Sequence, residues 1–266
     1  MHIVRFALLL ALTTLANSLQ AETLICTPIT SLPAVISTQG IFCLTGNLAT
    51  SITSGNAITI TTNNVTLDLN GWKIGGQGAG TATLAYGIYS TADNITIKNG
   101  IVRGFAYGID LTGRSATVQD VRLDQNTISG IAVTGQGAVV EHNQVVDTGG
   151  STAAISAFGI FVSGSGVTVS DNVVSGLTAT GTGSEYGIDV ISANNVVRGN
   201  VVSDTAPPSG GGTSYGIIQT QSIAVNNTVS NFGTGINNSG GIYAHNTIYS
   251  CTTNYIGGIA GAGNSP

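Results

Sequence analysis

A short phrase built on Gly-Ile returns seven times along this chain and limits its possible folds more than any other feature. The copies begin at Gly87, Gly108, Gly130, Gly159, Gly187, Gly216 and Gly235. The intervals between them are 21, 22, 29, 28, 29 and 19 residues. A repeat of that length cannot bury its own apolar face, so neighbouring repeats must stack on one another. The sequence therefore predicts a solenoid with one continuous core.

Each repeat is expected to contain two or three short strands. β-branched and polar residues alternate at 65–69, 95–100, 167–172 and 196–200, among other places. Such alternation is typical of strands, and no window after residue 55 has helical periodicity. Gly and Asn separate the strands, as expected at tight corners that need a positive φ. Like strands should pair in parallel about 4.8 Å apart, which gives an all-β solenoid of about eight coils, roughly 40 Å long.

Asparagines recur at matching places near the end of one strand in each repeat. The file contains Asn99, Asn143, Asn172, Asn200, Asn227 and Asn246, and Asp120 stands in it at one turn. A buried amide without partners costs about 1–3 kcal/mol, whereas stacked amides can bond to one another and to corner backbone. We interpret this file as structural; the alternative is a polar row that binds a ligand.

An aromatic residue precedes the glycine in five of the seven copies. These residues are Tyr86, Tyr107, Phe158, Tyr186 and Tyr215. Stacked repeats would bring their rings into a file, because equivalent positions of a solenoid superpose. Such a file can be packing or a platform that binds sugar rings. The second interpretation makes Tyr107, Tyr186 and Tyr215 candidate ligand-binding residues.

The chain is predicted to divide into a signal peptide (1–21), an N-terminal cap segment (22–55) and a solenoid domain (56–266). The first segment has a charged start, an apolar run and a small-residue cleavage site. The run is shorter than the roughly 20 residues of a membrane span, so we expect cleavage, no later span, and a secreted or periplasmic protein. An oxidising compartment allows a disulfide between Cys26 and Cys43. Within the cap, 32–36 is expected to form a short helical turn.

Two phrases of the chain resemble the repeats of a known family. They are Asn-Val-Thr-Leu-Asp-Leu-Asn-Gly at 64–71 and its echo, Asn-Ile-Thr-Ile-Lys-Asn-Gly-Ile-Val-Arg-Gly, at 94–104. They are similar to those of secreted bacterial right-handed parallel β-helix, or pectin-lyase-like, repeat proteins, over about residues 44–260. The resemblance implies an all-β, right-handed parallel β-helix. That fold hosts pectate lyases, polygalacturonases, alginate epimerases, phage tailspikes and non-catalytic adhesins, so it does not decide the function.

The catalytic patterns of the enzymes in that family are missing or incomplete in this sequence. The polygalacturonase-like Asn-Thr-Asp, Asp-Asp and Gly-His-Gly are absent, and so is the Arg-x-Pro-x-x-Arg context of pectate lyases. Alginate epimerases have a Tyr-Gly-Phe-Asp-Pro-His run; 107–110 and 186–189 share its first part and lack Pro-His. After residue 21 the only histidines are His142 and His245, and there is no Met. We therefore expect no cofactor and no metal.

Charged residues make up only 7% of the chain, but the basic ones are concentrated. Five of the six basic residues after position 21 lie between 73 and 122. Stacking is expected to place Lys98, Arg103, Asp120 and Arg122 on one face, with Asp110 or Asp124 on another. Basic groups beside carboxylates could neutralise a uronate and abstract its C5 proton. The candidate catalytic residues are therefore Lys98, Arg103, Asp110, Asp120, Arg122 and Asp124; the alternative is that they are solvated charges.

Three hypotheses of function remain open, and whether the protein is an enzyme is undecided. The low charge favours neutral polar ligands over nucleic acid, so the first is a β-helix that binds an extended polysaccharide or glycan surface. His142 then joins the three tyrosines as a ligand-binding residue. The second is a lyase or epimerase of uronate-containing polymers, and the third a structural or adhesive rod that self-associates through its C-terminal coil. Insertions at 148–158, 177–186 and 203–215 should project from one side and wall a groove.

Overall fold

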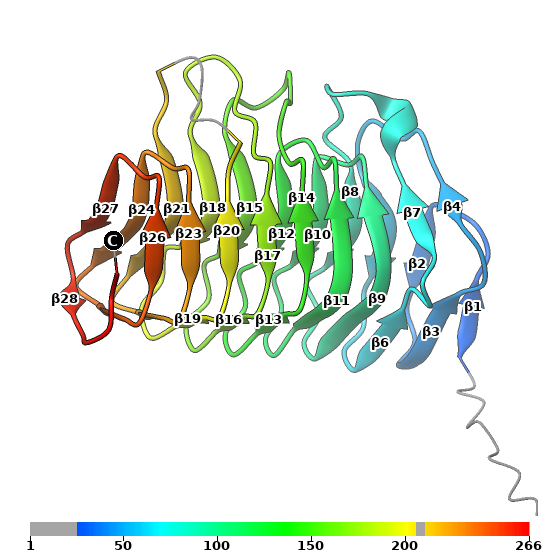
Figure 1. Cartoon of the computed structure of the whole chain (residues 1–266). Coiled ribbons are helices and arrows are strands. Elements are labelled where there is room, and N and C mark those ends of the chain that lie inside the picture. Colours follow the sequence, from blue (N-terminus) through cyan, green and yellow to red (C-terminus); the bar gives the residue numbers. More distant parts are fainter. Residues whose placement is uncertain (1–25, 206–210, 266) are drawn as a thin grey trace, which may run out of the picture.

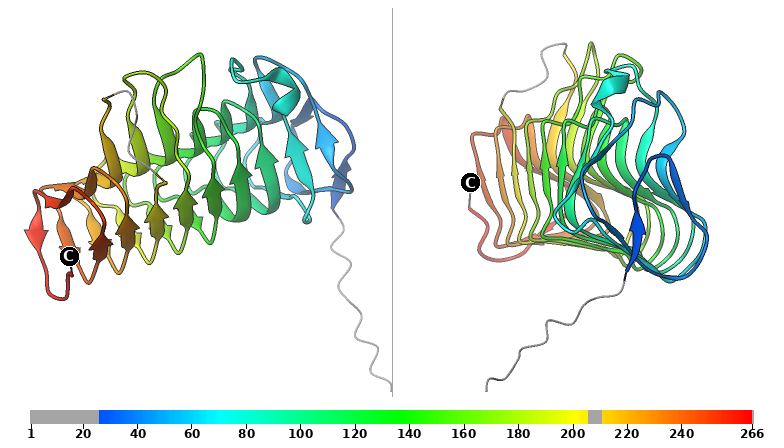
Figure 2. Two further views of the ribbon diagram at one scale, coloured as in Figure 1. Left: turned by 45° about the horizontal axis from the view of Figure 1, so that its top comes forward. Right: turned by 90° about the vertical axis from the view of Figure 1, so that its right-hand side faces the viewer.

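The chain forms a right-handed parallel β-helix, which confirms the predicted all-β fold class (Figure 1). The computed structural model describes residues 26–205 and 211–265, and the predicted signal peptide lies outside them. In this described part the only helix is the 3-10 turn η1 (Gln77–Ala79), and no helix has the length and apolar character needed to cross a membrane. Figure 2 shows the coils stacked into a rod.

The larger of the two sheets, sheet A, has 18 strands in two arms. The first arm contains β1 (Thr27–Ile29), β3 (Gly40–Leu44), β6 (Val65–Asp68), β13 (Val139–Glu141), β16 (Thr168–Ser170), β19 (Val196–Arg198), β22 (Ile223–Val225), β25 (Ile242–Ala244) and β28 (Ile259–Ala260). The second arm contains β4 (Leu48–Ala49), β7 (Lys73–Gly75), β14 (Gln144–Val146), β17 (Val173–Ser175), β20 (Val201–Ser203), β23 (Thr228–Ser230) and β26 (Thr247–Tyr249). Two long strands, β9 (Ile95–Arg103) and β11 (Thr117–Asp124), run through both arms and join them.

The smaller sheet, sheet B, has ten strands and lies behind the second arm in Figure 1. Its strands are β2 (Ala34–Ile36), β5 (Asn56–Ile60), β8 (Tyr86–Ser90), β10 (Tyr107–Leu111), β12 (Ser129–Val133), β15 (Ala157–Val162), β18 (Glu185–Val190), β21 (Ser214–Thr220), β24 (Thr234–Ser239) and β27 (Thr253–Ile256). Seven of the ten, from β8 to β24, contain the Gly-Ile phrase. The repeat read from the sequence is therefore the repeat of this sheet.

The N-terminal segment adds strands to both sheets. Residues 34–36 form β2, paired in parallel with β5, and not the helical turn that the sequence predicts. That expectation is wrong because Ile36, only 2% exposed, continues the inward row of sheet B, and burial of this kind outweighs a local turn preference. Cys26 and Cys43 form a disulfide where β1 pairs with β3.

A ladder of asparagines, all buried except the half-buried last member, lies inside the corner between the two arms. Its members are Asn143, Asn172, Asn200, Asn227, Asn246 and Asn264. At Asn172, Oδ1 accepts hydrogen bonds from the backbone N–H (2.9 Å) and the Nδ2 (3.0 Å) of Asn143. Its own Nδ2 donates to Val140 O at 2.9 Å. Neighbouring coils satisfy the amides in this way, so the structural interpretation of the file is confirmed.

Asn99 and Asp120 do not belong to this ladder, although their residue types suggest it. They lie one position earlier, at the exposed corner, with φ of 59° and 55°. The register places Gly100 and Val121 next to the ladder, and the Val121 N–H donates to Asn143 Oδ1 at 3.0 Å. Asparagine and aspartate tolerate a left-handed backbone, so the same residue types suit both positions. The predicted file is therefore one residue out of register at these two turns.

The glycine of the repeated phrase is required by close packing. A Cβ on Gly108 would lie 2.6 Å from Gly130 O and 2.8 Å from Asn126 Nδ2, which leaves no room for a side chain. Across this glycine the chain changes side: Tyr107 is half-buried on the outer surface, and Ile109 is fully buried in the core. The Gly-Ile phrase therefore separates an outward position from an inward one.

The long insertions leave the solenoid at one edge, between the second arm and sheet B, at the top of Figure 1. In neighbouring insertions, the Gly150 N–H donates to Thr178 O at 2.7 Å. The hydroxyls of Ser184 and Thr213 lie 2.9 Å apart. The described parts of the three insertions thus lie side by side, as predicted; residues 206–210 lie outside the described residues.

Candidate functional site

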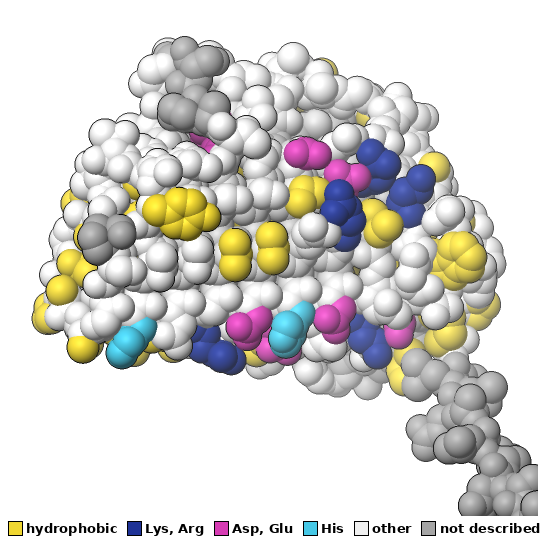
Figure 3. Space-filling view, viewed as in Figure 1, with side chains coloured by type: hydrophobic (Ala, Val, Ile, Leu, Met, Phe, Trp, Pro, Cys, Tyr) yellow, Lys and Arg dark blue, Asp and Glu magenta, His cyan; other side chains and the backbone are white. Residues whose placement is uncertain are grey.

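Three of the predicted site residues lie along the corner between the arms of sheet A. Asp120 and His142 each have a φ of 55°, because the corner needs a left-handed residue and both types can adopt that backbone. Lys98 precedes the corner, and its Nζ lies 3.4 Å from Asp68 Oδ2. In Figure 3 charged and histidine side chains form a row along the lower edge. The sequence predicts that Lys98 and Asp120 share a face with Arg103 and Arg122. They do not, because the corner separates them from the two arginines.

The remaining candidate catalytic residues divide between the two sheets. Arg103, Arg122 and Asp124 lie together on the second arm, at the ends of β9 and β11. Figure 3 shows basic and acidic side chains gathered on the N-terminal part of this face. Asp110 lies in β10 on the outer side of sheet B. The structure thus brings three of the six candidates together and places Asp110 on a different face.

The charges on the second arm are occupied with one another. Arg103 Nε lies 3.2 Å, and Arg122 Nη2 lies 3.8 Å, from the carboxylate oxygens of Asp124. The first contact is an ion pair without a hydrogen bond, because the Nε–H is not directed at the oxygen. The guanidinium groups also donate to Gln125 (2.7 Å, from Arg103) and Gln144 (2.6 Å, from Arg122). This network has the form of a structural ion cluster, with its one carboxylate shared between two arginines.

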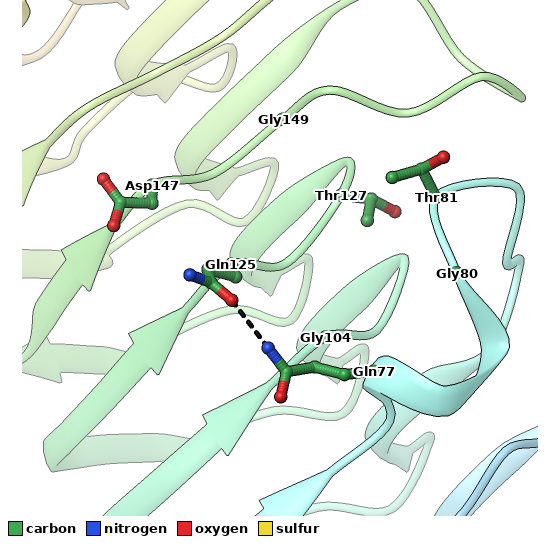
Figure 4. Close-up of a pocket in the computed structure, with 8 residues that line it drawn as sticks. All are labelled: Gln77, Gly80, Thr81, Gly104, Gln125, Thr127, Asp147 and Gly149. Carbon is green, nitrogen blue, oxygen red and sulfur yellow. Dashed lines mark hydrogen bonds between the residues drawn. The ribbon is translucent and has the colours of Figure 1, made fainter.

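A polar cleft of about 330 Å³ lies beside this network, at the edge where the insertions project (Figure 4). It is lined by Gln77, Gly80, Thr81, Gly104, Gln125, Thr127, Asp147 and Gly149. Gln77 Nε2 donates to Gln125 Oε1 at 2.6 Å across the cleft. The Thr152 N–H donates to Thr81 O at 3.2 Å, so the loop around η1 meets the first insertion. The cleft is lined by glycine and uncharged polar residues, and of the described residues in its lining Asp147 is the one that is charged.

The aromatic residues before each glycine form a file on the outer side of sheet B, which we call the aromatic file. Tyr86 and Tyr107 stack with ring centroids 4.8 Å apart. Phe158, Tyr186 and Tyr215 form a second stack, with centroids 4.9 and 5.7 Å apart. All five are half-buried and none belongs to the hydrophobic core. The rings pack on one another outside the solenoid, so three of the four predicted ligand-binding residues share one surface, and His142 does not.

A second file runs beside the first, three residues further along each strand. Its members are Tyr89, Asp110, Ala132, Phe161, Asp189 and Ile218, in strand order. Tyr89 packs edge-on against Tyr86 at 5.4 Å, and Phe161 packs edge-on against Phe158 at 5.8 Å. The outer face of sheet B therefore presents two aromatic clusters with carboxylates among them.

Both files are interrupted at β12, and we call the interruption the ring gap. The register places Ser129 between Tyr107 and Phe158. A pocket of about 200 Å³ opens there, lined by these three residues with Ala132 and Phe161. Ser129 and Ala132 are only 2% and 5% exposed, so they form its floor. Sequence analysis missed this site, although Ser129 is the single non-aromatic residue in the file between Tyr86 and Tyr215.

The second file contains two carboxylates: Asp110 adjoins the ring gap, and Asp189 lies two strands from it, beyond Phe161. Burial raises the pKa of Asp110 and that of Asp189 to about 6. Asp110 Oδ1 is buried and has no hydrogen-bond partner among the residues that the structure describes. Burial, and then the charge of Asp110, also raise the pKa of Tyr107. Three strand spacings separate the two carboxylates, about 14 Å, which exceeds the roughly 5–9.5 Å of carboxylate pairs that cleave glycosides.

A buried carboxyl pair lies below the insertions. Glu185 and Asp204 are 3% and 4% exposed. The N–H groups of Leu177 and Thr205 donate to Asp204 Oδ1 at 3.2 and 2.7 Å, and that of Ala179 donates to Glu185 Oε1 at 2.9 Å. Burial raises the pKa of Asp204 to about 7 and also raises that of Glu185. Over residues 26–205 and 211–265, no three His, Cys, Asp or Glu side chains converge as metal ligands would.

Solved structures with this architecture include phage tailspikes, at low sequence identity. The Dettilon tailspike protein has a TM-score of 0.59 at 17% identity, over 90% of this chain and 59% of its own. The enzymatically active domain of tailspike protein 2 from bacteriophage CBA120 gives 0.60 at 15%, over 84% and 42%. A tailspike of E. coli bacteriophage HK620, in complex with a pentasaccharide, gives 0.56 at 14%, over 80% and 51%. The chain spans about half the length of these neighbours, and the likeness is one of fold. By sequence, no family model and no curated protein matches the chain.

Proposed function

We propose that this chain is a secreted β-helix protein that binds an extended polysaccharide along the outer face of sheet B. The observation that supports it is the aromatic file, in which five half-buried rings form stacks of two and three on the outer face over several coils. The stacked rings cover one another's faces and present their edges to a ligand on this surface, and four of the five are tyrosines, whose hydroxyls can hydrogen-bond to a sugar. A row of such rings offers the same contact again and again along the rod. This suits an extended polymer, whose sugar residues also repeat along its length.

The composition and one structural neighbour agree with a saccharide as ligand. Charged residues are only 7% of the chain, so electrostatic attraction to a nucleic acid is weak. One structural neighbour, the HK620 tailspike, was crystallised with a pentasaccharide. The disulfide between Cys26 and Cys43 supports a secreted or periplasmic location, because such bonds persist in oxidising compartments.

Affinity electrophoresis through gels that contain different polysaccharides, together with a glycan array, tests this function. Wild type should be retained by at least one polymer. The double variant Tyr186→Ala, Tyr215→Ala should bind about ten- to a hundredfold more weakly, since each aromatic contact adds about 0.5–1.5 kcal/mol beyond its buried area. Tyr249→Ala, which removes a 52% exposed tyrosine from the second arm, is the matched control and should bind normally. Lack of retention on every polymer would refute the function.

A second candidate is a lyase or epimerase that acts on uronate polymers at the polar cleft. The observation that favours it is the position of Arg103 and Gln125 beside the cleft, where a guanidinium could approach a carboxylate ligand. Ultraviolet absorbance of unsaturated sugars on mixed uronates tests the lyase, and proton exchange at C5 tests the epimerase. Activity that is unchanged in Arg103→Ala and Arg122→Ala would remove these residues from the mechanism.

A third candidate is an adhesive rod that self-associates. Ile256 on β27 and Ile259 on β28 are 42% and 66% exposed on strands with no further partner strand in the described structure. Unpaired strand edges with apolar side chains can recruit another chain. Light scattering that finds only monomer at high concentration would argue against it.

A further inference from the structure

The ring gap is a missing rung in the aromatic file. Ser129 occupies the register position between Tyr107 and Phe158, while the rings on either side remain stacked in their own groups. Two strand spacings separate the bounding positions, about 9.6 Å. A ligand ring midway would lie about 4.8 Å from each aromatic ring, within the roughly 4.5–7 Å range of ring pairs.

We propose that the ring gap binds one pyranose ring of the polysaccharide, held between Tyr107 and Phe158. This inference rests on the proposed function and assigns it a specific subsite. The pocket volume of about 200 Å³ lies below the roughly 300–1,000 Å³ of pockets that bury larger ligands, so it accommodates a single ring. Ser129 and Ala132 provide a floor without side chains large enough to fill it.

We assign the polar contact that selects a sugar over an apolar ring to Asp110, which does not line the pocket itself but lies one strand spacing from its floor. It is the register partner of Ala132 in the floor of the gap. Its buried Oδ1 lacks a hydrogen-bond partner within the described chain, and an unsatisfied buried acceptor is unfavourable. A sugar hydroxyl is a donor that would satisfy it once the carboxyl group turns toward the gap. Phe161, edge-on to Phe158 at an interplanar angle of 73°, lines the gap with a second aromatic side chain.

The direction of the stack also restricts the kind of sugar residue. The rings of the aromatic file stack along the rod, so a ring inserted among them lies across the rod axis. A residue within a polymer backbone that follows the axis cannot easily turn across it. The subsite therefore suits a single-residue branch or a chain end, and the preferred ligand is a branched polysaccharide or one recognised at its terminus.

Saturation-transfer NMR on the full chain tests this subsite, with the methyl α-glycosides of glucose, galactose, mannose and rhamnose as probes. At least one should bind wild type. Ser129→Tyr supplies the missing ring and should abolish binding, and Asp110→Asn should weaken it about tenfold. Thr234→Tyr is the matched control, because Thr234 follows Tyr215 in the same file and gains the same ring outside the gap. If Ser129→Tyr does not fold, Phe158→Ala removes one wall and should cause the same loss.

The outcomes separate this inference from the proposed function. Methyl glycoside binding that persists in Ser129→Tyr would overturn the subsite. If wild type and Ser129→Tyr are retained equally by a polysaccharide gel, the proposed function stands and the subsite fails. Retention of wild type on no glycan removes both. If p-cresol fills the gap and no methyl glycoside does, the gap fits an aromatic side chain of a protein, and the inference is overturned.

Discussion

Two files of stacked like residues run along this solenoid, and they differ in completeness. The asparagine ladder lies inside and continues from Asn143 to Asn264, with each amide bonded to the next. The aromatic file lies outside and is interrupted at Ser129. In a complete inner file the side chains hydrogen-bond to one another, and these bonds stabilise the stack of coils. An exposed file with a missing member keeps contacts available for a ligand, so completeness and burial distinguish structure from binding where residue type does not.

The largest expected effect comes from removing one member of the asparagine ladder. Asn172→Ala leaves the backbone N–H and Nδ2 of Asn143 without their acceptor and Val140 O without its donor. At about 1–3 kcal/mol for each buried unsatisfied group, we expect the free energy of unfolding to fall by about 3–5 kcal/mol. Urea denaturation measures it. Asn237→Ala, half-buried on the outer side of sheet B, should cost less than about 0.5 kcal/mol. Equal losses of unfolding free energy in the two variants would mean that the ladder stabilises the fold no more than a surface asparagine does.

An effect of similar size is expected from pH, which acts on carboxylates and leaves the amide ladder unchanged. The pKa of Asp204 is raised to about 7, and those of Asp110 and Asp189 to about 6, from 3.8. Between pH about 4 and 7 the folded state therefore holds protons that the unfolded chain has released, so stability falls as pH rises through this window. We expect Asp204 to account for the largest part of that fall, about 4 kcal/mol at roughly 1.4 kcal/mol for each pKa unit, because its pKa is raised furthest.

Calorimetry of wild type and Asp204→Asn between pH 4 and 8 measures this contribution. The asparagine stays neutral, so the variant should lose less stability than wild type as pH rises. The difference between the two curves isolates Asp204 from the other carboxylates. Parallel curves would show that Asp204 does not retain its proton in the folded state.

The fold could be predicted from sequence because the repeat determines which residues face the core and which face outward. Each Gly-Ile phrase places an outward residue before the glycine and a core residue after it, and only stacked coils bury seven such core residues together. The register at the corner is harder to predict from the sequence. Asn99 suits a left-handed corner as well as an amide ladder, so residue type alone placed it one position out. The strand at 34–36 depends on burial against β5, which lies 24 residues away in pairing register.

The site was predicted less well, because residues close in sequence can lie on different faces. Lys98 and Arg103 belong to one continuous strand, yet the corner at Asn99 places them on different arms. The clustering of charges in the sequence therefore predicts a catalytic site where the structure has a network of arginines that pair with Asp124 and with glutamines. In the sequence, the ring gap is seen only as a serine at a position where the repeat predicts an aromatic residue. That serine indicates a pocket only if the rings on both sides lie outside the core, which the structure shows.

The smallest expected effect is on the second arm, and it tests whether the comparison names the correct face. The Arg122 side chain is 40% exposed and lies 3.8 Å from Asp124, so its ion pair should contribute less than about 1 kcal/mol. Arg122→Ala should accordingly unfold within that margin of wild type in urea and bind the same polysaccharide gel with equal affinity. Arg198→Ala, which removes a 50% exposed arginine paired to Asp171 at 3.8 Å on the first arm, controls for loss of one surface charge. If Arg122→Ala alone weakened retention more than about fivefold, a loss of roughly 1 kcal/mol in binding, the ligand would lie on the second arm and not on the aromatic file.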